Sequence, residues 1–245
     1  MRGVERISSG IDGLDPLIEG GFPKKRTILI VGAAGTGKSI MATQFLVKGA
    51  LQYDEPGVLV VLEEEPEKIK ANMMRFGWDL DALIESDLLR IVRAIPTRLS
   101  KEKYILERVS TSGYRDFSVE NLASLVHENI QQINATRIVF DPISSLEFYE
   151  SNTFRVRQEI SVLAKSMESK NMTTLMIAES SPRSPTGRFG IETFIADGVI
   201  VLYYLRKGNR RVRALEILKM RGTNHSPELI PFTIDSNGLR LIREK

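Results

Sequence analysis

Residues 27–39 have the sequence TILIVGAAGTGKS. The first part, TILIV, is apolar and mostly β-branched, which predicts a strand buried on both faces of a sheet. The second part, GAAGTGKS, matches the phosphate-loop (Walker A) pattern G-x-x-x-x-G-K-[ST] at every fixed position. The sequence that follows, IMATQFLVKGAL, predicts a helix whose positive N-terminal end would face a bound anion. Most chance matches would lack this strand and helix, so we predict that the loop binds nucleotide phosphates.

Each residue type in this loop has a physical role in phosphate binding. Glycines allow the backbone to curl so that successive N–H groups point inward at phosphate oxygens. Lys38 brings a cation to the β- and γ-phosphates, and the Ser39 hydroxyl can coordinate Mg²⁺. The candidate phosphate-binding residues are Gly32, Ala33, Ala34, Gly35, Thr36, Gly37, Lys38, Ser39 and Ile40.

The composition is that of an ordinary soluble globular protein. The chain has 245 residues, of which 42% are hydrophobic and 27% are charged, so we expect residues 1–245 to form a single domain. Its longest apolar run, residues 199–205, is far too short to cross a bilayer, and residues 1–6 do not lead into a signal peptide. The absence of cysteine excludes disulfides, thiol nucleophiles and Cys-ligated metals. We expect a cytoplasmic protein without membrane insertion.

The charge is spread unevenly along the chain. The net charge of +3 permits contact with nucleic acid but does not favour it. Five cations surround a predicted Gly208-Asn209 turn and indicate a basic hairpin tip: Arg206, Lys207, Arg210, Arg211 and Arg213. We prefer a solvated tip, and a patch that binds anions or nucleic acid is the alternative.

The hydrophobic pattern predicts strands that alternate with helices. Core strands are expected at residues 27–31, 58–62, 88–92, 137–141 and 173–179, and helices at 40–51, 66–76, 81–85, 120–133 and 154–169. The pattern changes to β at the C-terminal end, with strands expected at 199–205, 212–220, 232–234 and 239–242. The predicted fold class is α/β, a mostly parallel, doubly wound sheet flanked by helices and extended by antiparallel strands.

Two other segments lack a regular pattern. Residues 95–119 are irregular and polar, which indicates a surface excursion that could become ordered on assembly or ligand binding. Residues 180–189 contain two prolines and a glycine and are expected to form a loop.

Carboxylates follow the predicted strands on the rim where such sheets bind ligands. Asp141 ends a buried apolar strand, and a water-mediated contact to a Mg²⁺ ion shared with Ser39 would explain a carboxylate there. The alternative is that Asp141 caps a turn or helix at the strand end.

Glu63 and Glu64 follow the strand predicted at residues 58–62. Phosphoryl transfer to water needs a group that orients or deprotonates the attacking water, and a carboxylate at this rim can do so. The alternative, a solvated acidic run before the next helix, we assign to Glu65 and Glu67. Glu179 could sense the γ-phosphate or be a plain surface acid, and both interpretations stay open.

Residues 219–225, KMRGTNH, gather hydrogen-bond donors just after a strand. Cations not needed by their own phosphate loop could serve the nucleotide of a neighbouring subunit, as an arginine finger does. Spacing alone favours an ordinary surface cluster, and His225 alone would be a surface or capping residue. Neither a neighbouring His nor any Cys supports a transition-metal site.

The chain resembles the KaiC-like branch of the RecA superfamily of ATPases, and is most similar to a single KaiC domain of the archaeal type. The matching stretches run from about residue 9 to residue 241 in the family's order: SGIDGLD, GGFP, GAAGTGKS, DEPGVLVVLEEEP, FGWDL, RIVFDPISSL, RFGIETFIADGVIVL and EILKMRGTNHSPELIPFTI. KMRGTNH after a hairpin, together with EE after the second strand, is specific to this family rather than to phosphate-loop proteins at large.

The resemblance implies a RecA-type core and ring-shaped hexamers that hold ATP and Mg²⁺ between subunits. It implies that Lys38 and Ser39 bind phosphate and Mg²⁺, that Asp141 is the second Mg²⁺ partner, and that Glu63 and Glu64 are the catalytic carboxylates. It also implies that residues after the hairpin reach the neighbouring subunit's nucleotide: Lys219, Met220, Arg221, Thr223 and His225.

Three departures from KaiC matter. KaiC has two such domains and this chain has one; the positions of its phosphorylated Ser-Thr pair are Thr193-Phe194 here; and nothing follows Lys245, where KaiC has a regulatory tail. These departures do not favour autokinase activity and favour similarity to the domain that only hydrolyses ATP. In addition, Pro142 replaces a serine that often follows the strand-end aspartate, which removes a hydroxyl near the metal.

The resulting hypothesis is a ring-like homo-oligomeric, Mg²⁺-dependent ATPase that uses its ATP state to regulate an unknown protein partner. One alternative is an ATP-binding regulatory scaffold with little hydrolysis, against which Glu63 and Glu64 argue. Another is a recombinase-like DNA-binding ATPase, with DNA held by residues 206–213 and 180–189. The second of these segments has only two cations, Arg183 and Arg188, so DNA binding is not favoured.

Overall fold

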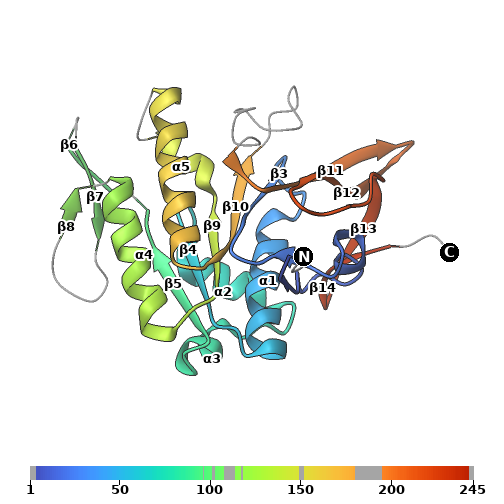
Figure 1. The fold of residues 1–245 in the computed structure, drawn as a ribbon, viewed down its shortest axis with the longest axis horizontal. Coiled ribbons are helices and arrows are strands. Elements are labelled where there is room, and N and C mark those ends of the chain that lie inside the picture. The colour runs from blue at the N-terminus through green and yellow to red at the C-terminus, as the bar shows by residue number, and fades with distance from the viewer. Residues whose placement is uncertain are drawn as a thin grey trace.

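The computed structural model describes residues 4–95, 97–100, 103–107, 114–116, 118–148, 152–179 and 195–242. Within these ranges the chain forms a central twisted sheet with helices packed on both of its faces (Figure 1). The loop expected at residues 180–189 and the candidate phosphoacceptor Thr193 lie outside the described residues.

The central sheet has nine strands in the order β14-β13-β12-β11-β3-β10-β9-β4-β5. The strands from β11 to β5 pair in parallel, and β12, β13 and β14 extend the sheet by antiparallel pairing. Their bounds are β3 (Thr27–Gly32), β4 (Gly57–Val61), β5 (Leu89–Arg93), β9 (Arg137–Asp141), β10 (Thr173–Glu179), β11 (Gly198–Lys207), β12 (Arg210–Met220), β13 (Ile230–Asp235) and β14 (Gly238–Leu241). This arrangement confirms the predicted fold class.

The alternation of side chains along each strand assigns them to two hydrophobic cores. In β3, Ile28 and Ile30 pack into the core beneath α1 (Lys38–Tyr53), α2 (Pro66–Met74) and α3 (Leu80–Glu85). Leu29 and Val31 point to the other face, where α4 (Val119–Ile133) and α5 (Thr153–Ser169) pack. The fully buried run in β3 therefore follows from a sheet covered on both sides.

Two buried polar side chains anchor α1, the helix that follows the phosphate loop. The Gln44 side-chain amide donates to the carbonyl oxygens of Gly10 (2.9 Å) and Leu239 (3.0 Å) and accepts from the Leu239 N–H (2.7 Å). The Arg137 guanidinium, from β9, donates to the Phe45 carbonyl oxygen at 2.8 Å and lies 4.4 Å from the Phe45 ring centroid. These bonds join α1 to the N-terminal segment, to β14 and to the centre of the sheet.

The prediction that residues 95–119 are irregular is wrong. This segment contains β6 (Thr97–Ser100), β7 (Lys103–Glu107) and β8 (Tyr114–Asp116), which form a separate three-stranded antiparallel sheet. The strands are short and contain many polar residues, so they lack the hydrophobic alternation by which a half-buried strand is found. The structure defines them by antiparallel pairing between strands that follow one another in the chain.

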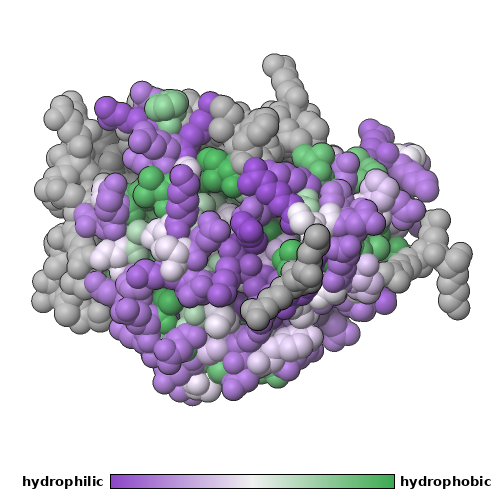
Figure 2. Space-filling view, in the orientation of Figure 1, coloured by the Kyte–Doolittle hydropathy of each residue, from purple (hydrophilic) through white to green (hydrophobic). Residues whose placement is uncertain are grey.

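The smaller elements complete the chain. They are β1 (Arg6–Ile7) and β2 (Phe22–Pro23), which pair with each other, and the 3₁₀ helices η1 (Asp15–Ile18) and η2 (Ile143–Phe148). On the face shown in Figure 2, hydrophilic residues predominate in the described part and hydrophobic residues form small, separate groups. Among the described residues, no helix combines the length and the apolar character that crossing a bilayer requires.

Candidate nucleotide-binding site

The phosphate loop connects the end of β3 to the start of α1, as the sequence predicts. Gly35 and Gly37 have φ angles of +78° and +107°, in the left-handed region that favours glycine. The Thr36 hydroxyl donates to the Ala33 carbonyl oxygen at 2.8 Å and closes the loop on itself. These positive φ angles explain the glycines at positions 35 and 37.

The N-terminus of α1 is arranged to receive an anion. Its N-cap residue is Gly37, no side chain caps the helix, and its first turn holds no acidic residue. The first intrahelical bond runs from the Met41 N–H to the Gly37 carbonyl oxygen at 2.9 Å. The preceding N–H groups of the first turn are therefore available to phosphate oxygens at the positive end of the helix dipole.

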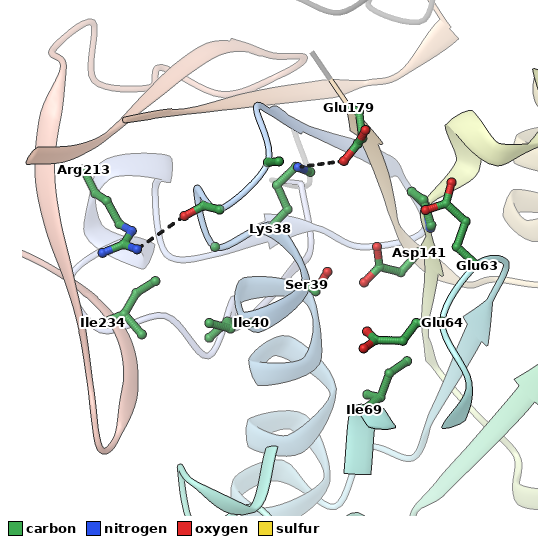
Figure 3. Close-up of a pocket in the computed structure, with 14 residues that line it drawn as sticks. Lys38, Ser39, Ile40, Glu63, Glu64, Ile69, Asp141, Glu179, Arg213 and Ile234 are labelled. Atoms are coloured by element: carbon green, nitrogen blue, oxygen red, sulfur yellow. Dashed lines mark hydrogen bonds and ion pairs between the residues drawn. The ribbon is translucent and has the colours of Figure 1, made fainter. Parts of the chain in front are cut away.

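A pocket of about 330 Å³ lies at this end of α1 (Figure 3). It brings together most of the predicted site: Ala34, Gly35, Gly37, Lys38, Ser39, Ile40, Glu63, Glu64 and Asp141. Its other lining residues are Ile69, Pro142, Glu179, Arg213 and Ile234. Glu63, Glu64 and Asp141 lie on the side of the pocket away from Arg213 (Figure 3).

Lys38 is a buried cation in this pocket. Its Nζ donates to the Ala33 carbonyl oxygen at 3.1 Å and lies 4.0 Å from Oε1 of Glu179. Burial lowers the pKa of Lys38, whereas the nearby carboxylates, first that of Glu179, act to raise it. A buried ammonium group beside a free helix N-terminus suits a polyanionic ligand.

The residues that could hold Mg²⁺ fit that ion. The two predicted partners, Ser39 and Asp141, lie side by side at the pocket (Figure 3). Burial raises the pKa of Asp141 to about 6, and the charges of Glu63 and Glu64 add to this effect, whereas the nearby Ser39 hydroxyl and the charge of Lys38 act to lower the pKa. A hard divalent cation prefers such oxygen ligands and would offset the cost of burying the carboxylate charge.

Glu63 and Glu64 follow β4, which pairs with β9 so that Val61 lies opposite Asp141. The Leu62 N–H donates to the Asp141 carbonyl oxygen at 3.0 Å and joins the two strand ends. Both glutamate side chains are exposed and line the pocket. Both carboxylates are therefore accessible to a ligand in the pocket.

Arg213 is a pocket residue that the sequence analysis placed at the solvated hairpin tip. Its Nη2 donates to the Gly35 carbonyl oxygen at 3.3 Å, and its guanidinium lies 4.7 Å from the Tyr204 ring centroid. The cause is strand register: Arg213 lies opposite Tyr204 on β11, and Leu202 of β11 lies opposite Gly32 of β3. Counting residues from the predicted turn would have paired Arg213 with Tyr204, but its approach to the phosphate loop also depends on the pairing of β11 with β3. The other four cations, Arg206, Lys207, Arg210 and Arg211, are exposed, as a solvated tip requires.

The residues predicted to reach a neighbouring nucleotide lie at the opposite edge of the sheet from the pocket. Met220 lies opposite Gly198, and Gly198 lies opposite Ile28, near the amino end of β3. The phosphate loop instead follows the carboxyl end of β3, at Gly32. As formed by the described residues, the phosphate-loop pocket is therefore lined by no member of this predicted set, which consists of Lys219, Met220, Arg221, Thr223 and His225.

Local contacts hold this second cluster in place. Lys219 Nζ donates to the Ala196 carbonyl oxygen at 2.7 Å, and Arg221 Nη1 lies 3.5 Å from Oδ1 of Asp197. The Thr223 hydroxyl accepts a hydrogen bond of 2.7 Å from the Arg6 guanidinium. Burial and, to a smaller extent, the charge of Arg221 lower the pKa of Lys219. A ring nitrogen of His225 lies 3.1 Å from the carbonyl oxygen of Ser226.

Comparisons with known proteins identify relatives over the whole fold. Residues 7–245 match the family model described as "ATPase: KaiC". The chain is 35% identical over 242 residues to the circadian clock oscillator protein KaiC of Parathermosynechococcus lividus, a match that covers 98% of this chain and 43% of that protein. The protein of the same name from Synechococcus elongatus is 35% identical over 240 residues, which cover 97% of this chain and 44% of that protein.

A solved structure shares this fold over its full length. The crystal structure of a KaiC-like protein from the hyperthermophilic archaeon Pyrococcus horikoshii matches with a TM-score of 0.83 and 36% sequence identity. The match covers 98% of this chain and 100% of that chain. By contrast, the chain spans less than half the length of the two circadian clock proteins.

Proposed function

The chain belongs to the KaiC family of ATPases, and from this premise we propose that residues 1–245 act as one domain that binds ATP and hydrolyses it with Mg²⁺. One observation carries the proposal. The phosphate loop, the partly buried carboxylate of Asp141 and the glutamates at positions 63 and 64 converge on one pocket from three separate strands. An ATP-binding scaffold without turnover would need the loop but would have no use for the two glutamates.

The chain's own residues provide for each part of the ligand. Backbone N–H groups of the loop and the Lys38 ammonium bind the β- and γ-phosphates. Ser39 and Asp141 would hold Mg²⁺, which when bound would neutralise the negative charge of the phosphates. Arg213, which donates to the Gly35 carbonyl oxygen, adds a second cation on the side of the pocket away from the carboxylates (Figure 3).

The chemistry rests on positioning rather than on a covalent enzyme intermediate. Glu63 and Glu64 orient the attacking water and accept its proton, while the water oxygen forms a bond to the γ-phosphorus and the bond to the β-phosphate oxygen breaks. Lys38 and the loop N–H groups stabilise the charge that gathers on the departing phosphate oxygens.

We also propose that the chain assembles into a ring-like homo-oligomer, with ATP between adjacent subunits. The pocket and the Lys219–Arg221 cluster lie at opposite edges of one sheet, so a contact between them joins different patches of two copies. Such a heterologous contact produces a ring when its rotation closes. The ATP state of the ring would then change its contacts with a protein partner, which is the regulatory role that we propose.

Size-exclusion chromatography with light scattering, with phosphate release measured in the same samples, tests this function. We expect Mg²⁺-ATP to convert the protein into a closed oligomer that releases phosphate. The reason is that the pocket of one subunit and the Lys219–Arg221 cluster of the next would both contact the charged ligand. A monomer that binds ATP without releasing phosphate would overturn the ATPase and support the regulatory scaffold instead.

A mixing experiment tests the proposed contribution of one subunit to its neighbour's site. Lys38→Ala and Arg221→Ala each remove one side of the composite site, so we expect each variant alone to be inactive. When equal amounts are mixed before assembly, about a quarter of the interfaces combine an intact pocket with an intact Arg221. We therefore expect the mixture to regain about a quarter of the wild-type phosphate release. A mixture no more active than its components would place Arg221 outside the site.

A further inference from the structure

A buried serine outside the phosphate loop contacts one of the two candidate catalytic glutamates. Ser145 is 0% exposed, and its hydroxyl donates to Oε1 of Glu63 across 2.6 Å. This distance is typical of a charge-assisted O–H···O⁻ hydrogen bond. The two residues are 82 positions apart in the chain and meet because β4 and β9 are neighbours in the sheet.

The donor is held rigidly. Ser145 belongs to η2. Only Pro142 separates this helix from Asp141, the last residue of β9. On either side of it, Ile143 and Leu146 are buried in the hydrophobic core beneath α4 and α5. The Ser145 N–H also donates to the Pro142 carbonyl oxygen at 3.2 Å. The hydroxyl therefore has a fixed position relative to Asp141 and the pocket floor.

The acceptor, by contrast, needs restraint. Glu63 is exposed and lies beyond the end of β4, so its side chain would otherwise sample many rotamers. Glu64 has a weaker constraint, a contact of 3.5 Å between its Oε1 and the side-chain amide of Asn72 on α2. Of the two glutamates, Glu63 is thus the one oriented by a buried donor.

We propose that Ser145 is a positioning residue for ATP hydrolysis, which holds one carboxylate oxygen of Glu63 so that the other faces the attacking water. This inference rests on the proposed ATPase function and deepens it. The hydrogen bond selects the productive rotamer of Glu63 before the nucleotide binds, and the orientation of a reacting group makes a large contribution to rate. Ser145 itself touches neither the nucleotide nor the water.

Ser145→Ala removes only the hydroxyl and leaves the buried packing of η2 in place. We expect kcat for phosphate release to fall about tenfold, while KM for ATP stays within about twofold of wild type. Ser145→Thr keeps a hydroxyl at this position and should recover most of the lost kcat. Ser9→Ala makes the same change at another fully buried serine, whose hydroxyl accepts from the Ile11 N–H away from the pocket, and should leave kcat unchanged.

Combined variants separate positioning from a general structural effect. Because Ser145 acts through Glu63, Ser145→Ala should reduce kcat no further in a Glu63→Gln background but should still reduce it about tenfold in a Glu64→Gln background. An equal reduction in both backgrounds, or wild-type kcat in Ser145→Ala, would overturn the inference while leaving the ATPase intact. If the wild-type protein releases no phosphate, the proposed function fails and this inference fails with it.

Discussion

Lys38→Ala is expected to abolish ATP binding, with a loss of affinity of about a hundredfold or more. The side chain supplies the one cation on the loop itself, and its Nζ lies inside the pocket, 3.1 Å from the Ala33 carbonyl oxygen. Charge-assisted hydrogen bonds contribute about 1.5–3 kcal/mol each, and Lys38 makes such bonds to two phosphates in the proposed complex. The loss of two such bonds amounts to about 3–6 kcal/mol, which corresponds to a loss of affinity of about a hundredfold or more.

Titration with a fluorescent ATP analogue, together with calorimetry, measures this loss. Lys38→Met keeps the buried aliphatic packing and should lose as much affinity as Lys38→Ala, which separates charge from folding. Lys68→Ala removes an exposed lysine of α2 and should bind ATP normally. Wild-type affinity in both Lys38 variants would mean that the loop does not hold the phosphates through this side chain.

The strands and helices around the phosphate loop could be predicted because their signals are local. The bounds predicted for residues 137–141 and 173–179 agree with β9 (Arg137–Asp141) and β10 (Thr173–Glu179). Both strands are buried on two faces, so their apolar runs are continuous and end abruptly at the charged rim. The three-stranded sheet from β6 to β8 was missed because its short strands have no such run.

From the sequence, a residue of the candidate site could be predicted only where it lies at the end of a strand or helix. Asp141 is the last residue of β9, Glu63 and Glu64 come just after β4, and the carboxyl ends of parallel strands share one edge. The order of strands in the sheet does not follow from local pattern, yet this order makes β4 and β9 neighbours. The contact between Glu63 and Ser145 depends on this strand order. In the same way, the approach of Arg213 to Gly35 depends on the register of β12 against β11.

Replacing both Glu63 and Glu64 by glutamine is expected to spare ATP binding and to stop turnover. Glutamine keeps the size and the hydrogen-bonding reach of glutamate but cannot accept a proton, so water would be bound without being activated. General bases contribute about 10²–10⁴-fold to rate, and with both carboxylates replaced we expect phosphate release to fall by at least about 10³-fold. The affinity for ATP should change little, because the phosphates contact the loop and Lys38 rather than these side chains.

The measurement is phosphate release alongside ATP affinity in the same preparation. Glu65 and Glu67, which follow Glu64 one and three positions further along, allow a matched control, because Glu65 pairs with Arg93 at 2.8 Å and Glu67 with Lys70 at 2.9 Å. Exposed pairs of this kind stabilise proteins by less than about 1 kcal/mol, so the double change to glutamine there should leave both quantities near wild type. Unchanged hydrolysis in the Glu63→Gln, Glu64→Gln variant would remove both glutamates from the mechanism and would make the proton acceptor another group at the rim, with Glu179 the next carboxylate in the pocket lining.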